Sequence, residues 1–178
     1  MAALAIQTRE DGLLGALAPL GLAAAAGTAL VIDLDPDGPR YPGTGSLAQL
    51  VSDQPRRQDL EPTRSGLAVL RNGGVEYREV ASLVSALIRG WPAVVLRIGS
   101  GLRPPPELAT VTVHPLLPGG LFEAPEAPAV YQPMGFRMAV PGGGLMLPPL
   151  TRRVVGGLLG GNVPRRSRWI RAWGALWD

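Results

Sequence analysis

The stretch Ala29–Leu34 (ALVIDL) most constrains the fold, because it is apolar and rich in β-branched residues apart from Asp33 near its end. A short apolar run of this kind is typical of a strand in a parallel sheet that helices cover on both faces. A single strand of this type cannot bury its own surface, so it requires further strands and helices from the same chain. We therefore search the sequence for alternating strands and helices.

Similar apolar runs occur before and after this stretch and alternate with segments of helical periodicity. The other predicted strands are Ala2–Thr8, Leu67–Leu70, Pro92–Ile98 and Thr110–Val113. The predicted helices are Leu13–Ala25, with a break near Pro19, then Ser46–Val51 and Glu79–Arg89. This order predicts an α/β fold with a mostly parallel, doubly wound sheet and helices on both faces.

The last third of the chain has a different character. Residues 115–148 are rich in Pro and Gly, and within them Ala129–Val140 predicts one or two short edge strands. Gly142-Gly143-Gly144 is interpreted as a turn, because neither a basic residue nor a helix cap follows it in register. Residues 149–178 predict a helix over Pro149–Leu159 and a final helix that begins after Pro164. We expect 1–114, 115–148 and 149–178 to form one compact domain.

Composition closes off much catalytic chemistry. The chain has no Cys, its only histidine is His114, and all 17 basic residues are Arg. Thiolate nucleophiles, Cys-based metal sites, multi-histidine metal sites and any lysine-dependent reaction are therefore excluded. The replacement of Lys by Arg, together with abundant Ala, Gly and Pro, is typical of a high-GC genome.

Charge is distributed unevenly along the chain. Residues 1–126 carry 10 Arg and 13 acidic residues, whereas residues 127–177 carry 7 Arg and no acidic residue. A basic region of this kind favours an anionic partner: a membrane surface, nucleic acid or an acidic protein face. The uncharged segment Gly12–Ile32 is long enough to span a membrane, but its Ala, Gly and Pro content and its acidic flanks favour a buried helix followed by a buried strand.

Leu30–Pro36 (LVIDLDP), placed after a strand and an Ala-rich helix, resembles the MinD/ParA family of P-loop ATPases. That family includes the CpaE/TadZ-like proteins of pilus assembly and septum-site-determining-like proteins. The resemblance covers about residues 1–114 and implies that Asp33 and Asp35 correspond to the acidic pair that serves magnesium and water positioning in active members. The alternative interpretation is that these two carboxylates only cap a turn at the strand end.

The chain departs from the family at the positions that nucleotide hydrolysis needs. Thr8-Arg9-Glu10-Asp11-Gly12 stands where the family has a glycine-rich loop with lysines, and two carboxylates there would repel a triphosphate. Arg97 stands where the family usually has an acidic residue, and we expect it to pair with Asp33 or Asp35. The resemblance therefore implies a degenerate nucleotide face at Asp33, Asp35 and Gly12, without a catalytic residue, a metal site or a cofactor.

The C-terminal segment carries the candidate interaction residues, which are Arg and Trp side chains on one predicted helix. They are Arg165, Arg166, Arg168, Trp169, Arg171, Trp173 and Trp177. The Trp residues are spaced i, i+4, i+8 and share a helix face. That face is expected to pack on the domain or on a partner, or alternatively to lie at a membrane interface, as the C-terminal helix of MinD-like proteins does.

The family resemblance implies a non-catalytic, cytoplasmic positioning or assembly factor in pilus or secretion assembly or in septum placement. Its expected partner is a protein, either an active MinD/ParA-like ATPase or a second copy in a homodimer; nucleic acid is the least favoured partner. One alternative is a peripheral module at the inner face of the membrane that uses the Arg/Trp tail. The other is a small hydrolase or transferase that uses His114 or the pair Asp33/Asp35.

Overall fold

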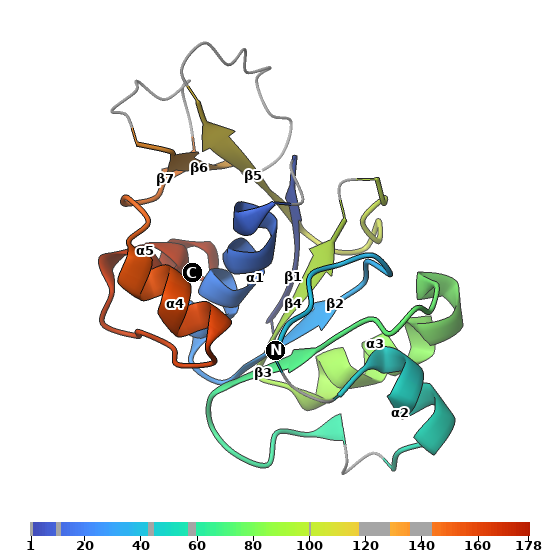
Figure 1. The fold of residues 1–178 in the computed structure, drawn as a ribbon. Coiled ribbons are helices and arrows are strands. Elements are labelled where there is room, and N and C mark those ends of the chain that lie inside the picture. Colours follow the sequence, from blue (N-terminus) through green and yellow to red (C-terminus); the bar gives the residue numbers. More distant parts are fainter. Residues whose placement is uncertain are drawn as a thin grey trace.

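The computed structural model describes residues 2–9, 12–42, 45–56, 60–99, 101–117, 129–135 and 144–178. In these residues seven strands form one sheet in the order β3-β2-β4-β1-β5-β6-β7, and every neighbouring pair is parallel (Figure 1). The strands are β1 (Ala2–Thr8), β2 (Ala29–Asp33), β3 (Leu67–Leu70), β4 (Ala93–Ile98), β5 (Thr110–Leu116), β6 (Ala129–Pro133) and β7 (Leu145–Met146). The predicted parallel α/β architecture is confirmed.

Helices cover both faces of the sheet, as expected. One face packs against α1 (Leu13–Ala26), α4 (Arg152–Leu159), α5 (Arg168–Ala172) and the 3-10 helix η2 (Trp173–Leu176) (Figure 1). The opposite face over β2, β3 and β4 packs against α2 (Leu47–Asp53) and α3 (Tyr77–Gly90). Two apolar clusters result, because successive side chains of each strand point to opposite faces.

The central strands are buried as their composition requires. All residues of β2 and all residues of β4 are buried, which agrees with their apolar character apart from Asp33 and Arg97. Together α1 and β2 fill the uncharged segment Gly12–Ile32, so the interpretation as a buried helix and strand is confirmed. Within the described ranges, no helix combines the length and the apolarity that crossing a membrane requires.

Three predicted elements differ from the structure. α1 continues through Pro19 without a break. β5 extends to Leu116, so His114 lies inside the strand rather than at its end. Of the one or two edge strands predicted within Ala129–Val140, the described residues contain β6, which ends at Pro133 and is not at the edge, because β7, which lies beyond the predicted range, pairs with it. Residues 136–143, which include Gly142 and Gly143, lie outside the described residues.

The predicted final helix is also shorter than expected. It begins after Ser167, whose hydroxyl accepts a hydrogen bond from the Trp169 backbone N–H, and not directly after Pro164. α5 ends at Ala172 and the chain tightens into η2. The side-chain cap at Ser167 sets the start, because the first N–H groups of a helix require an acceptor that Pro164 does not supply.

Neighbouring glycines in α4 provide a matched test of this packing. Gly156→Ala is expected to raise the free energy of unfolding by about 0.5–1 kcal/mol, because a Cβ there meets no atom within 4 Å and Ala lowers the entropy of the unfolded chain. Gly157→Ala is expected to lower it, because its Cβ would lie 2.6 Å from the Asn162 carbonyl oxygen. Urea denaturation of both variants measures the difference; equal shifts would contradict the described turn after α4.

Candidate functional site

The candidate site lies at the carboxyl ends of β2 and β4, where ligands bind in open parallel sheets. Asp33 is the last residue of β2, and in the parallel ladder it is in register with Arg97 of β4. Residues in register on adjacent parallel strands point to the same face of the sheet. Both side chains therefore point toward α1, and Asp35 follows two residues after Asp33.

Arg97 joins the two carboxylates. Its Nη1 donates to Asp33 Oδ1 at 2.9 Å and to Asp35 Oδ2 at 3.0 Å. The side chains of Arg97 and Asp33 are 3% and 2% exposed, whereas that of Asp35 is 14% exposed. The pairing of Arg97 with the acidic residues is therefore confirmed, and it is a buried ion pair extended by a second carboxylate.

Arg97 also explains why Pro19 does not break α1. Proline has no backbone N–H, so in a helix Pro19 leaves the Gly15 carbonyl oxygen without its usual donor. Arg97 Nε donates to that oxygen at 3.3 Å. A side chain from β4 thus replaces the missing helical hydrogen bond, and the site is connected to the helix that follows β1.

Small residues and local turns enclose the ion pair. A Cβ on Gly38 would collide with Asp33 Oδ2, and one on Gly99 would collide with Asp35 Oδ2, so both positions require glycine for close approach. The Asp35 backbone N–H donates to Asp33 Oδ1 at 3.1 Å. The Asp33 carboxylate therefore caps a turn at the end of the strand, as the alternative interpretation predicted, and it also pairs with Arg97.

Burial dominates the electrostatics of the site. Burial raises the pKa of the Asp33 carboxyl, and the charge and hydrogen bond of Arg97 oppose this shift. Burial likewise raises the pKa of Tyr41, whose hydroxyl donates to the Ala16 carbonyl oxygen at 3.0 Å. Tyr41 was not predicted as part of the site, because nothing in the loop composition around it indicates burial.

The connection between β1 and α1 is short. Four residues, Arg9 to Gly12, separate Thr8 from Leu13, and Gly12 caps α1 through its backbone without a side-chain hydrogen bond. A phosphate loop requires a longer glycine-rich segment that ends in a lysine. Glu10 and Asp11 of this connection lie outside the described residues.

These residues do not fit a magnesium–nucleotide site. The guanidinium of Arg97 lies between the two carboxylates that would have to face a cation. Among the described residues, no group of three or more His, Cys, Asp or Glu side chains is arranged to hold a metal ion. We therefore derive no step through a bound nucleotide.

A cavity of about 320 Å³ opens beside the ion pair, between the ends of β2 and β3. Asp33 and Asp35 line it together with Arg40, Arg71 and Asn72. Asn72 is buried, and its Oδ1 accepts hydrogen bonds from two backbone N–H groups of the following turn. The sequence predicted that turn, but the two arginines come from separate loops, and no local pattern brings them together.

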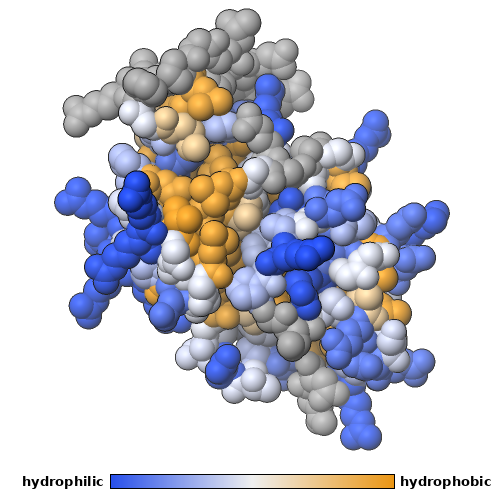
Figure 2. Space-filling model, in the orientation of Figure 1, coloured by the Kyte–Doolittle hydropathy of each residue, from blue (hydrophilic) through white to orange (hydrophobic). Residues whose placement is uncertain are grey.

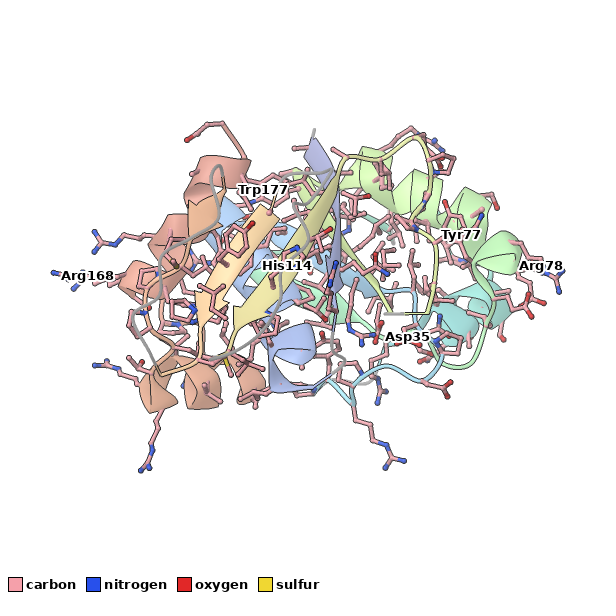
Figure 3. The ribbon with its side chains drawn as sticks, turned by 90° about the horizontal axis from the view of Figure 1, so that it is seen from above. Asp35, Tyr77, Arg78, His114, Arg168 and Trp177 are labelled. Carbon is pink, nitrogen blue, oxygen red and sulfur yellow. The ribbon has the colours of Figure 1, made fainter. Side chains whose placement is uncertain are left out.

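His114 is not part of this site. It lies within β5, is 4% exposed, and stacks against Tyr131 of β6 with ring centroids 5.6 Å apart. Burial lowers the pKa of its imidazole, and the charge of Arg9 adds to the shift. In Figure 3, His114 lies within the sheet and apart from Asp35.

The Trp residues of the tail pack on the domain. Trp169 and Trp173 are 1% and 0% exposed and meet edge to face with centroids 5.5 Å apart. Trp169 Nε1 donates to Gln132 Oε1 at 2.6 Å, and Trp177 Nε1 donates to the Leu22 carbonyl oxygen at 2.9 Å. The packing alternative therefore describes this structure, and Trp169 and Trp173 are core residues rather than surface contacts.

The arginines of the tail point the other way. Arg165, Arg166, Arg168 and Arg171 are all exposed. Figure 3 shows Arg168 projecting away from the body of the protein, on the opposite side from Arg78. Of the predicted interaction residues, Trp169 and Trp173 are thus buried, Trp177 is partly buried, and the arginines are exposed.

The fold and the site define a parallel α/β protein with helices on both faces and an ion pair at the carboxyl edge of its sheet. Its chain is similar to the crystal structure of a ParA family ATPase from Chlorobium tepidum TLS, with a TM-score of 0.69 over 99% of this chain and 98% of that chain. Sequence identity is 12%, so the likeness establishes the fold. The sequence matches no protein-family model and no curated protein.

Proposed function

We propose that this chain is a non-catalytic protein with a MinD/ParA-like fold that acts through protein contacts as a positioning or assembly factor. The observation that carries the proposal is the Arg97 side chain, which contacts both Asp33 and Asp35. A guanidinium held between these carboxylates neutralises them and takes the place of a cation. The acidic pair that would serve magnesium is thus used to hold β2, β4 and α1 together.

The β1–α1 connection supports the same proposal. It has four residues, Arg9 to Gly12, and neither the lysine nor the repeated glycines that cradle phosphates. Arg9 alone would have to offset the charges of Glu10 and Asp11 as well as those of a triphosphate. Loss of the loop and occupation of the acidic pair by Arg97 are separate changes, and both oppose nucleotide hydrolysis.

The partner is proposed to be a protein, either an active ATPase of the same fold or a second copy of this chain. The processes that the family resemblance suggests are pilus or secretion assembly and septum placement. A peripheral membrane role through the tail is less favoured, because Trp169 and Trp173 are buried and cannot enter a bilayer from this conformation. An enzyme based on His114 is less favoured, because the cavity at the carboxyl edge is not lined by it.

Titration with Mg-ATP tests the proposal. Isothermal calorimetry of the full chain is expected to show no binding heat in the micromolar range, and phosphate release is expected to equal that of the buffer blank. Asp35→Asn is the matched control, since it removes one carboxylate of the pair and leaves the β1–α1 connection intact. Phosphate release that exceeds the blank and is abolished by Asp35→Asn would overturn the proposal.

A further inference from the structure

A groove with a volume of about 850 Å³ lies between α4 and the segment 163–169. We call it the arginine groove, because Arg153, Arg165, Arg166 and Arg168 line it and no carboxylate of a described residue does. Between the arginines its lining is apolar and includes Val154 and Val163. Figure 2 shows hydrophilic side chains projecting on the side of α4 and α5, next to an apolar area.

The positive charge of this region is not balanced within the described chain. Six exposed arginines lie between Thr151 and Ala172, and the only acidic residue after them is Asp178. None of the six forms an ion pair with a described residue, while Arg165 donates a long hydrogen bond of 3.5 Å to the Gly27 carbonyl oxygen. Guanidinium groups at this density repel one another, and bound carboxylates relieve that repulsion through paired N–H···O bonds.

The groove is held in shape by the fold beneath it. Trp169 is anchored to Gln132 of β6, and Gln132 also donates to the Pro133 and Pro148 carbonyl oxygens. At the start of α4, the Thr151 hydroxyl accepts a hydrogen bond from the Val154 N–H. A preformed groove loses little conformational entropy when a ligand binds, and this favours a specific occupant.

The shape and chemistry of the groove select among anionic partners. A membrane is flat and would require exposed apolar side chains, yet Trp169 and Trp173 are buried. Single-stranded nucleic acid would require exposed rings for stacking. Among the described residues, Trp169 is the only aromatic residue that lines the groove, and it is 1% exposed. An extended peptide with acidic and aliphatic side chains matches both the arginine walls and the apolar lining.

We propose that the arginine groove binds an acidic, extended segment of a partner protein. Its carboxylates pair with Arg153, Arg165, Arg166 and Arg168, and its aliphatic side chains contact Val154 and Val163. The proposed function requires a protein partner, and this proposal, which rests on that function, describes the chemistry of the partner's binding segment. The electrostatic component makes the interaction sensitive to salt.

Fluorescence anisotropy with the full chain tests the proposal. The probe is a short labelled peptide of Glu, Val and Pro, and the matched peptide has Gln in place of Glu. The Glu peptide is expected to bind and the Gln peptide is not. The double variant Arg153→Glu/Arg166→Glu is expected to weaken binding by about tenfold or more, because it removes two charge-assisted pairs and replaces them with like-charge repulsion.

Arg89→Glu is the control, since Arg89 is an exposed arginine of α3 on the other face of the sheet. The affinity of this variant for the Glu peptide is expected to stay within about twofold of the wild-type affinity. Equal affinity of the double variant and the wild type would overturn the proposal. So would arginine-dependent binding of anionic vesicles or an oligonucleotide in the absence of peptide binding. The peptide-binding experiment contains no nucleotide. A failure of the peptide to bind would therefore overturn the arginine groove as a peptide site, whereas a positive Mg-ATP titration would overturn the proposed non-catalytic function.

Discussion

Arg97→Ala is expected to lower the free energy of unfolding by about 3–5 kcal/mol, the range for breaking a buried ion pair by removing one partner. The loss arises because Asp33, whose side chain is 2% exposed, would retain a buried charge without its counter-charge. The substitution also removes the donor to the Gly15 carbonyl oxygen, which Pro19 already leaves without a helical hydrogen bond. Urea denaturation followed by circular dichroism measures the change.

Two controls distinguish this ion pair from a general effect of arginine removal. Arg89→Ala, at an exposed site, is expected to change the free energy of unfolding by less than about 0.5 kcal/mol. Arg97→Met is expected to become less destabilising when Asp33→Asn is added, because the second substitution removes the charge of the more deeply buried of the two carboxylates that lose Arg97. If Arg97→Ala costs no more than Arg89→Ala, the ion pair is not what holds β2, β4 and α1 together.

Trp169→Ala is expected to lower the free energy of unfolding by about 3–5 kcal/mol, as large-to-small substitutions of a buried Trp do. Trp169 packs so closely on α1 that a Cβ on Gly21 would collide with its ring. Removing the indole also leaves the buried Gln132 Oε1 without its donor, which adds a desolvation cost. Urea denaturation followed by far-ultraviolet circular dichroism avoids the loss of a Trp fluorophore.

Trp169→Phe keeps most of the ring volume but removes the hydrogen bond to Gln132. It is expected to lower the free energy of unfolding less than Trp169→Ala does, and the difference separates the contribution of ring packing from that of the hydrogen bond. Trp177→Ala is the second control. Because Trp177 is only partly buried, this substitution is expected to lower the free energy of unfolding less than Trp169→Ala does. Unchanged stability of Trp169→Ala would contradict the packing of the tail on α1. It would then favour a detachable tail, which the membrane alternative requires.

The sequence predicted the site in part. Asp33 and Arg97 were recognisable, because each ends or nearly ends an apolar run and the carboxyl ends of parallel strands meet at one edge. The second interaction of Arg97, with Gly15, was not predictable, because it depends on a helix packed across the sheet. Without that contact the sequence indicated a break at Pro19, which is the expected local effect of proline.

By itself the sequence determined the α/β class, the central strands, the absence of lysine and cysteine chemistry and the basic excess of the last third. These follow from periodicity and composition, which act over a few neighbouring residues. Only the tertiary structure decided that Trp169 and Trp173 belong to the core while Arg165, Arg166 and Arg168 remain exposed. A helical Trp stripe is equally suited to a membrane and to a core, and here the complementary surface of α1 at Gly21 and the amide of Gln132 bury it.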